Sequence, residues 1–326
     1  MSEEVIDAVL TWVDGADPAL QAKQARYRPA RRGDPAVAPT RFADSGEIFF
    51  ALASLLRFAP WLRRIHVVTD GQVPDVFERL SDRFGAEAVA RIGLVDHREI
   101  YAGFEHLLPV FNSLSIVTML HRIPSLARRY IYLNDDVFLL RPCEPADFFA
   151  RDHLVIRGKL RNDWPVRLRR AARKTTGGRL FWRMGFKEGQ VNAASLFGQS
   201  SRYLSLDHTP HPFFRDRIEA FFAERPEVME RNAAPRWRAH GQFSAAALSY
   251  TLDRRAGNSV LHPTELLYLQ PDRRPDPQAY LTARFAQSER THPRFACIQS
   301  LDAAPPEARE TAFDWLQARV LSESIA

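Results

Sequence analysis

Four short hydrophobic runs stand out in the first 140 residues, and each leads into aspartate. They read VIDAVLTWVDG, IHVVTDG, IGLVDH and YIYLNDD. Runs of this length, rich in β-branched and aromatic residues, are typical of buried β-strands. We therefore expect four strands that carry acidic residues at their carboxyl ends, namely Asp14, Asp70, Asp96 and the pair Asp135–Asp136.

The segments between these runs carry hydrophobic residues at helical spacing. In GEIFFALASLLRFAPW one face is formed by Ile48, Leu52, Leu55 and Leu56, and FNSLSIVTMLHRIP keeps the same period up to Pro124. Alternating strands and helices predict the α/β class, with a doubly wound, mainly parallel sheet. Ligands of such sheets bind beyond the carboxyl ends of the strands. Several carboxylates on that rim would need a cation or a cationic ligand beside them.

The second half of the chain is predicted to be mostly helical. HPFFRDRIEAFFAERP and GQFSAAALSYTLDRRAG have helical periodicity, and PPEARETAFDWLQARVLSE is typical of a terminal amphipathic helix. We expect one domain over residues 1–326. It would consist of an α/β core at 1–150, a basic insert at 151–200 and a helical part at 201–326.

Positive charge is concentrated in the insert. Residues 157–183 contain ten Lys or Arg and a single acidic residue, Asp163. One interpretation is a solvated basic helix, and the other is contact with a polyanionic acceptor or with lipid headgroups. The whole chain has a net charge of +6, which favours anionic partners such as nucleotides, acidic polymers or membrane surfaces.

Cysteine content and hydropathy bear on location. Cys143 and Cys297 are the only cysteines, so there is neither a disulfide framework nor a zinc-binding spacing, which fits a reducing compartment. The first residues, MSEEVIDAVLTWVDG, lack a basic leader, and no apolar run approaches ~18 residues. A cytoplasmic location is expected, with peripheral contact at the inner membrane through the basic insert as an option.

Two motifs near the N-terminus each allow two interpretations. In IDAVLTWVDGADP, Trp12 offers a stacking face and Gly15 lets backbone approach a phosphate, or the segment is simply a strand and a turn. In RFADSGE, Asp44 and Glu47 have the spacing of a helix capping box. The alternative there is an anion site formed by Arg41 and the helix amides.

Three later motifs carry candidate chemistry. His208 in HTPHP is a candidate for proton transfer or phosphate contact. RWRAHGQF contributes Arg236, Arg238 and His240, any of which would neutralise phosphate. The two aspartates of YLNDDVFLLRP would hold a metal, remove a proton or cap a turn. No Walker loop, GxGxxG, GxSxG or kinase signature is present, and aromatic residues do not interleave with a basic stripe, so a nucleic-acid partner is not expected.

Taken in order, these blocks resemble the Stealth family of sugar-1-phosphate transferases, which build phosphodiester-linked polysaccharides. The first block is IDAVLTWVDGADP, and the second runs from RFADSGE through APWLRRIHVVTDGQVP, VDHREI and LPVFNSLSIVTMLHRIP to YIYLNDDVFLLRP. The third is DHTPHPF with RWRAHGQF, and the fourth is ACIQSLD. The resemblance implies a GT-A/Rossmann-like catalytic domain whose first 150 residues bind a nucleotide sugar.

The implied reaction transfers a sugar-1-phosphate from a UDP-sugar to a hydroxyl of a saccharide or polysaccharide, releasing UMP with the help of Mg²⁺ or Mn²⁺. By the same resemblance the catalytic residues are Asp136, His208 and Arg238, and the metal ligands are Asp135 and Asp136. Either Asp136 or His208 would take the acceptor's proton. The expected donor-binding residues are Asp7, Thr11, Trp12, Asp14, Gly15, Arg41, Asp44, Asp70, Gly71, Asn112 and Asn134.

The chain departs from the family pattern at two acids. Val117 stands where the family usually has Glu, and Gln242 stands where it has Asp. Two alternatives therefore stay open. One is an ordinary GT-A glycosyltransferase that releases UDP, and the other is a relative that binds sugar nucleotide or polysaccharide with weakened chemistry.

Overall fold

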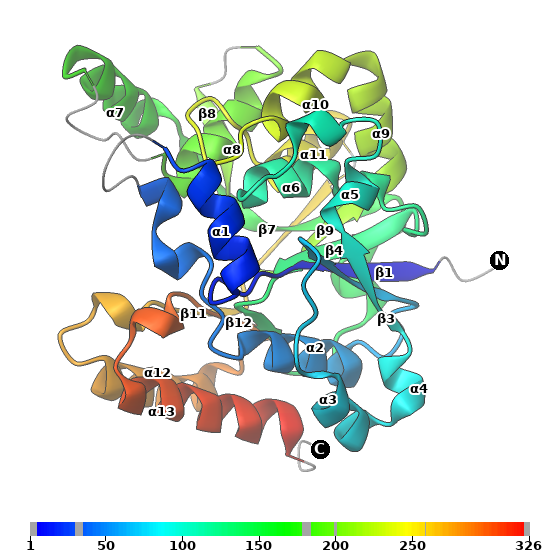
Figure 1. Cartoon of the computed structure of the whole chain (residues 1–326), viewed down its shortest axis with the longest axis vertical. Helices are drawn as coiled ribbons and strands as arrows, with labels where there is room; N and C mark the ends of the chain where they lie inside the picture. Colours follow the sequence, from blue (N-terminus) through cyan, green and yellow to red (C-terminus); the bar gives the residue numbers. More distant parts are fainter. Residues whose placement is uncertain (1–4, 30–34, 178–183, 199–200, 258, 323–326) are drawn as a thin grey trace.

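A computed structural model describes residues 5–29, 35–177, 184–198, 201–257 and 259–322, and its centre is a five-stranded sheet (Figure 1). The strand order is β3-β2-β1-β4-β9, with β9 antiparallel to β4 and the other pairs parallel. The strands are β1 (Ile6–Thr11), β2 (Ile65–Thr69), β3 (Ile92–Asp96), β4 (Arg129–Asn134) and β9 (His211–Phe214). The α/β class and the mainly parallel sheet are confirmed, and β3-β2-β1-β4 is the order of Rossmann-type nucleotide-binding sheets.

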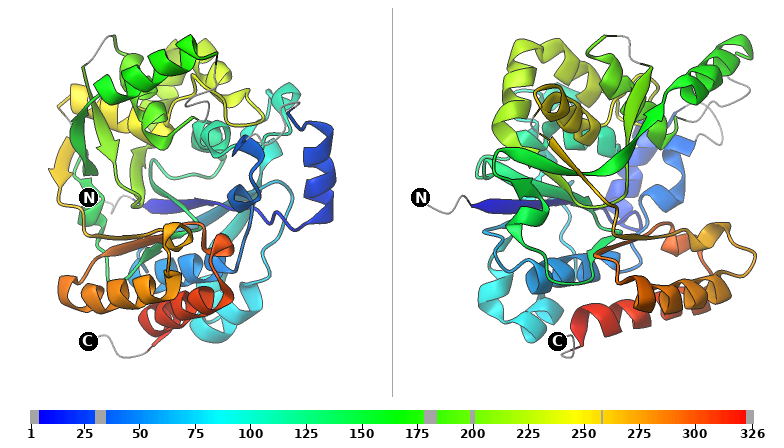
Figure 2. Two further views of the ribbon diagram at one scale, coloured as in Figure 1. Left: turned by 90° about the vertical axis from the view of Figure 1, so that its left-hand side faces the viewer. Right: turned by 180° about the vertical axis from the view of Figure 1, so that it is seen from behind.

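Helices cover both faces of this sheet (Figures 1 and 2). One face carries α2 (Glu47–Phe58), α3 (Phe77–Phe84), α12 (Pro277–Thr291) and α13 (Pro306–Leu316). The other carries α6 (Ser113–Met119), α9 (Arg215–Glu224), α10 (Pro226–Ala233) and α11 (Ala245–Arg255). Nearly every side chain of α2 is buried, because this helix is sandwiched between the sheet and the terminal helices. Three short helices in the first half of the chain are α1 (Pro18–Arg26), α4 (Ala86–Val89) and α5 (His97–Ile100).

Helices dominate the second half as predicted, but it also supplies strands that sequence periodicity did not reveal. Two smaller sheets have the orders β10-β7-β6, with β8 added to β7, and β11-β12-β5. Their strands are β5 (Val137–Leu139), β6 (Phe149–Ala150), β7 (His153–Asn162), β8 (Arg202–Leu206), β10 (Ser259–His262), β11 (Leu266–Leu269) and β12 (Phe295–Ile298). The last two helices are α7 (Trp164–Thr175) and α8 (Phe186–Ser195).

The segment HPFFRDRIEAFFAERP shows why one strand was missed. Its phenylalanines fit a helical period, yet the helix α9 begins only at Arg215. Phe213 and Phe214 instead form β9, where they pair with Tyr130 and Arg129 of β4 and are buried. Long-range pairing with a buried strand therefore overrides the local pattern.

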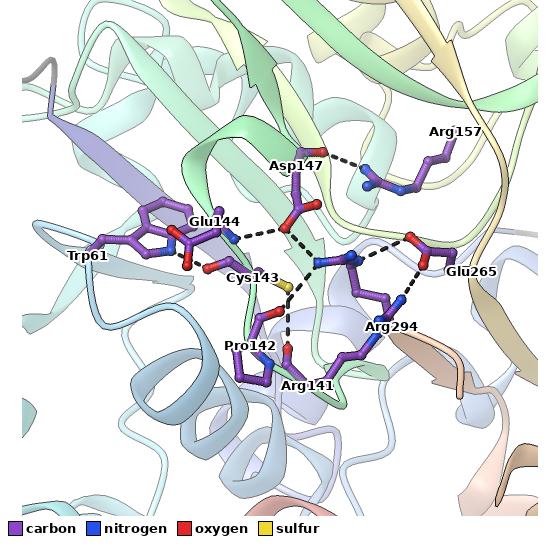
Figure 3. A network of polar contacts seen from close by, with 9 residues as sticks. All are labelled: Trp61, Arg141, Pro142, Cys143, Glu144, Asp147, Arg157, Glu265 and Arg294. Carbon is purple, nitrogen blue, oxygen red and sulfur yellow. Dashed lines mark hydrogen bonds and ion pairs between the residues drawn. The ribbon is translucent and has the colours of Figure 1, made fainter. Parts of the chain in front are cut away.

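A partly buried polar network joins the strands around β5 (Figure 3). Arg294, just before β12, donates to Asp147 Oδ2 at 2.7 Å and to Glu265 Oε2 at 3.1 Å. Arg157 of β7 donates to the Asp147 carbonyl at 2.9 Å, and Arg141 pairs with Glu265. These contacts hold β12 against the chain that leaves β5. Because Gln299 directly follows β12, the network also fixes the position of that side chain.

Candidate active site

The aspartate pair lies in the turn between β4 and β5, at the carboxyl end of the central sheet. Burial raises the pKa of Asp136 to about 6, although hydrogen bonds from Cys297 and Gln299 oppose the shift. Burial also raises the pKa of Asp135 well above its ordinary value, and repulsion from Asp136, Glu47 and Asp44 adds to it. Asp136 Oδ1 is buried without a hydrogen-bond partner in the part of the chain that the structure describes. The two carboxylates therefore have different neighbours.

Glu47 completes an acidic cluster made of Asp44, Glu47, Asp135 and Asp136. Its side chain is 8% exposed, and burial raises its pKa to about 7, with repulsion from Asp44 and Asp136 adding to the effect. The capping-box interpretation of Asp44 and Glu47 is wrong, because α2 begins at Glu47 with Gly46, at φ 105°, as its N-cap. Asp44 Oδ1 accepts from the Gly46 amide at 2.8 Å, and Glu47 Oε2 accepts from the Ser45 amide at 2.6 Å.

Trp12 forms a hydrogen bond to one carboxylate of this cluster. Its indole N–H donates to Asp44 Oδ2 at 3.0 Å, and only 7% of the residue is exposed. The predicted open stacking face is therefore not available in this structure. Trp12 instead holds one carboxylate of the acidic cluster in place.

Two further predicted residues meet at Tyr132, which lies in β4 three residues before Asp135. The Tyr132 hydroxyl donates to Asn134 Oδ1 at 2.6 Å and lies 3.1 Å from Thr11 Oγ1. Because that hydroxyl gives its proton to Asn134, Thr11 is the donor in the second bond. Thr11, Asn134 and the aspartate pair are thus brought together at the ends of β1 and β4.

The amide of Gln299 links Asp136 to His208. Gln299 Oε1 accepts from the Tyr268 hydroxyl at 2.6 Å and from Gln270 Nε2 at 3.0 Å, which fixes the orientation of the amide. Gln299 Nε2 therefore faces His208 Nδ1, at 3.5 Å, and Asp136 also accepts from this side chain. An amide nitrogen can only donate, so His208 Nδ1 is an acceptor and the proton of the neutral ring lies on Nε2.

The His208 ring is held in a stack of three. Its centroid lies 4.5 Å from that of Phe186 and 5.0 Å from that of Tyr268, with interplanar angles of 22° and 16°. Burial lowers the pKa of His208, and the nearby Asp207 opposes the shift. The neutral ring is therefore the form that this environment favours near neutral pH, in agreement with the hydrogen bond from Gln299.

Arg238 reaches the site from the loop between α10 and α11. Its Nη2 donates to Ser113 Oγ at 2.8 Å, and its charge is close enough to lower the pKa of Tyr132, although burial of that phenol raises it more. Asn112 caps α6 beside it, because its Oδ1 accepts from the Leu114 amide at 3.1 Å. Arg238 is thus placed near Tyr132, whose hydroxyl bonds Asn134.

The position of Gln242 explains one departure from the family pattern. Its Oε1 accepts from Asn112 Nδ2 at 2.7 Å and from the Ala239 amide at 2.9 Å. Its Nε2 donates to Ser115 Oγ at 3.0 Å and to the Asn232 carbonyl at 2.9 Å. An amide satisfies all four contacts, whereas a carboxylate could not donate. Val117, the other departure, packs half-buried against the main core.

Four predicted donor-binding residues lie around the loops that follow β1 and β2. The Gly15 amide donates to the Phe42 carbonyl at 2.6 Å, and a Cβ on residue 15 would lie 2.5 Å from that oxygen, so close packing requires glycine. Asp14 pairs through its backbone with the side chain of Gln72, and Asp70 forms an ion pair with Lys23 at 2.7 Å. Gly71 turns the chain at φ +73°. Arg41, next to Phe42, ends the short 3₁₀ segment Pro39–Arg41.

Asp7 is the one predicted residue that lies away from this edge. It is the second residue of β1, at the amino end of the sheet, and its side chain is fully buried. Arg63 donates to both carboxylate oxygens, at 2.9 and 2.6 Å, and the Ala127 amide donates at 2.8 Å. His66 lies 3.2 Å from Oδ2. From these contacts we infer a structural role for Asp7.

Replacing Asp7 by asparagine is expected to lower the free energy of unfolding by about 3 kcal/mol, because the Arg63 guanidinium loses its counter-charge. Burial alone would raise the pKa of Asp7, but hydrogen bonds from His66, Arg63 and Ala127 outweigh it and hold the pKa below 3.8. The stabilisation is therefore present above pH 3.8 and is lost as the pH falls through the folded-state pKa. Urea unfolding at several pH values measures both effects.

The exposed Asp75 provides the matched control for that change, and Asp75→Asn is expected to leave stability within about 0.5 kcal/mol. Donor affinity per folded molecule should be the same in both variants. Normal stability together with weak donor binding in Asp7→Asn would contradict the structural role.

The described residues contain no group of three or more His, Cys, Asp or Glu side chains arranged to hold a metal ion. The acidic cluster nevertheless fits a divalent cation by charge. Repulsion from Asp44 and Asp136 adds to the raised pKa of both Asp135 and Glu47, and Asp136 Oδ1 is buried without a partner among the described residues. Mg²⁺ is commonly bound by one or two carboxylates together with substrate phosphates, so a complete protein cage is not required.

Two family models match the chain: Stealth protein conserved region 1 over residues 4–32 and conserved region 2 over residues 41–156. A receptor polysaccharide phosphotransferase of Streptococcus oralis is 30% identical over 256 residues, covering 72% of this chain and 73% of that protein. An exopolysaccharide phosphotransferase of Streptomyces coelicolor is 32% identical over 312 residues, covering 93% of this chain and 30% of that protein. The chain belongs to the Stealth family.

A capsular polysaccharide phosphotransferase of Actinobacillus pleuropneumoniae is 38% identical over 153 residues, covering 46% of this chain and 40% of that protein. The chain thus spans less than half the length of the Streptomyces and Actinobacillus relatives. Among solved structures, the galactosyltransferase LgtC has a TM-score of 0.41 at 12% identity, with 98% of this chain and 97% of that chain covered. Mouse xyloside xylosyltransferase 1 has a TM-score of 0.38 at 13% identity, covering 90% and 98%.

Proposed function

We propose that this chain transfers a sugar-1-phosphate from a UDP-sugar to a hydroxyl of a saccharide or polysaccharide, with release of UMP. Relatives of the same family carry the name polysaccharide phosphotransferase, which supports the reaction class. The observation that carries the proposal is the connection of Asp136 to His208 through Gln299 at the carboxyl end of a nucleotide-type sheet. In this proposal residues 1–150 bind the donor and residues 201–326 complete the site.

In the proposed reaction the acceptor oxygen attacks the β-phosphorus of the donor. A new bond forms between that oxygen and phosphorus, and the bond from the β-phosphorus to the bridging oxygen breaks, so that UMP leaves with the bridging oxygen. The acceptor hydroxyl gives up its proton in the same step. Such transfers require the protein mainly to position the reactants and to neutralise phosphate charge.

Asp136 is the proposed base. Its Oδ1 has no hydrogen-bond partner among the described residues, and a pKa of about 6 leaves the carboxylate ionised at neutral pH. His208 cannot take the proton through Nε2, because the Gln299 contact leaves that nitrogen protonated. We assign His208 the role of hydrogen-bond donor to a phosphoryl oxygen, and Arg238 the role of neutralising phosphate charge.

The cation, Mg²⁺ or Mn²⁺, is assigned to the carboxylate of Asp135, with substrate phosphates completing its coordination. When bound, the ion would neutralise charge on the phosphates and on the acidic cluster. Asp135 suits this task because it faces Asp136, Glu47 and Asp44 and lacks the hydrogen bonds from Cys297 and Gln299 that engage Asp136. Thr11 and Asn134, at the ends of β1 and β4, are proposed to contact the donor.

The decisive experiment incubates the chain with a panel of UDP-sugars, saccharide acceptors and Mg²⁺ or Mn²⁺, and measures UMP and UDP separately. UMP release with a phosphodiester signal in the phosphorus NMR spectrum of the product is the expected result. Accumulation of UDP with a glycosidic product would show an ordinary glycosyltransferase instead. Donor binding without release of either nucleotide would show a relative that only binds sugar nucleotide.

A further inference from the structure

Helix α7 leaves the body of the molecule and points into solvent (Figures 1 and 2). It has 12 residues, WPVRLRRAARKT, and no acidic residue after Asp163, which precedes it. Its inner side is anchored on α8 and β8: Val166 forms a small hydrophobic cluster with Val191 and Tyr203. Within the part of the chain that the structure describes, only one side of α7 therefore packs on the protein.

Ion pairs reinforce that anchored side. Arg173 donates to both oxygens of Glu188, at 3.1 and 2.9 Å, and Arg170 lies 3.6 Å from the same carboxylate. Glu188 belongs to α8 and is only 8% exposed. Two of the cations of α7 are thus committed to holding the helix on the protein.

The opposite side of α7 is hydrophobic although it faces water. Trp164 and Leu168 stand one turn apart, and each is 63% exposed. Ala171 and Thr175 continue the same stripe, since residues four and three apart lie on one helix face. An exposed tryptophan and leucine aligned in this way are unfavourable in water and require a partner.

Cations border one flank of the hydrophobic stripe. At 100° per residue, Arg167 and Lys174 lie next to the stripe on that flank, and both are exposed. Asp163, which precedes the helix, lies 3.9 Å from Arg167. A hydrophobic stripe bordered by cations is the pattern of helices that lie in the interface of anionic bilayers, where Trp and Leu enter the acyl region and Arg and Lys meet the headgroups.

We propose that α7 docks this chain on an anionic lipid surface through Trp164 and Leu168, with Arg167 and Lys174 contacting lipid phosphates. A soluble polyanion would account for the cations but not for the exposed leucine. Among the described residues, no helix has both the length and the hydropathy to cross a bilayer. The proposal does not depend on the chemistry proposed above, because none of these residues belongs to the candidate active site.

Docking by α7 would also set the orientation of the site. Helix α8, which carries Glu188, begins at Phe186, and Phe186 stacks on His208 at 4.5 Å. Helix α8 therefore contacts both α7, which would bind lipid, and His208, which would act in catalysis. An acceptor anchored in the same membrane would then be held close to the site.

The test is flotation of the full chain with phosphatidylcholine vesicles that either contain or lack phosphatidylglycerol. We expect binding to the anionic vesicles only, weakened by added salt. The double variant Trp164→Ser/Leu168→Ser should lower the lipid partition coefficient about tenfold or more. Arg167→Gln/Lys174→Gln should lower it too and should reduce its dependence on salt. Because these side chains are exposed, thermal unfolding should be unchanged.

The matched control is Val73→Ser/Leu94→Ser, which removes two hydrophobic side chains that are 66% and 40% exposed elsewhere on the surface. It should bind anionic vesicles like the unchanged chain. The proposal would be overturned if the α7 variants bound anionic vesicles as well as the unchanged chain does. It would also be overturned if the unchanged chain bound neutral vesicles as well as anionic ones. So would binding of soluble polyphosphate that is lost in Trp164→Ser/Leu168→Ser, or a dimer that this variant dissociates, because each identifies another occupant of the stripe.

Discussion

Replacing Asp136 by asparagine is expected to lower kcat for UMP release about 10³-fold, because the amide cannot take the acceptor's proton. The fold should not suffer. Burial raises the pKa of Asp136, which means that the ionised carboxylate is unfavourable in this site, and a neutral amide removes that cost. We therefore expect unfolding to require the same or a higher urea concentration, while turnover is lost.

Asp135→Asn provides the comparison for that variant. If Asp135 holds the cation, its loss should raise the Mg²⁺ concentration needed for half-maximal rate and leave part of the turnover at saturating metal. Asp136→Asn should not recover at any metal concentration. Turnover in Asp136→Asn within tenfold of the unchanged chain would exclude Asp136 as the base.

The second large effect is expected at His208, where two substitutions separate donation from proton transfer. His208→Ala should lower kcat about 10²–10³-fold, the loss typical of a donor to a developing oxyanion. His208→Gln should keep most of the rate, because its amide nitrogen can donate from near the position of Nε2. If His208 were the general base, both variants would lose the rate of UMP release to the same extent. Rates of UMP release at saturating donor measure the difference.

The protonation of His208 can also be observed directly. Nitrogen NMR of histidine-labelled protein should show Nδ1 unprotonated and Nε2 protonated at neutral pH. Gln299→Leu removes the amide that donates to Nδ1, so the tautomer population should shift in that variant. A protonated Nδ1 in the unchanged chain would contradict the assignment of His208 as a donor through Nε2.

Sequence periodicity was sufficient to place the aspartate pair at the carboxyl end of a buried strand. It failed for Glu47, because the spacing of Asp44 and Glu47 is also the local signature of a helix cap. The structure shows that Glu47 belongs to the acidic cluster, because its carboxylate is repelled by Asp136, which lies almost 90 positions away in the chain. Local pattern contains no information about such a contact.

Gln299 was missed for a related reason. A lone glutamine after a short strand has no chemical signature, and its importance follows from Tyr268, Gln270, His208 and Asp136 meeting around one amide. Asp7 is the reverse situation, a residue that the sequence singled out and that lies far from the aspartate pair. It belongs to the same motif as Trp12 and Asp14, yet six residues of extended strand separate the two ends of β1 and place Asp7 on the far edge of the sheet.

The pairing of β4 and β5 with late strands has a consequence for synthesis. The open edge of β4 is covered by β9, about 80 residues later in the chain, and β5 is covered by β12, about 150 residues later. At ribosomal speeds of roughly 5–20 residues per second, that interval lasts on the order of ten seconds. During this time the nascent chain exposes unpaired hydrophobic strands next to its future site, and unpaired strands invite aggregation. Slow translation or a nascent-chain chaperone should therefore decide how much of this protein folds in a cell.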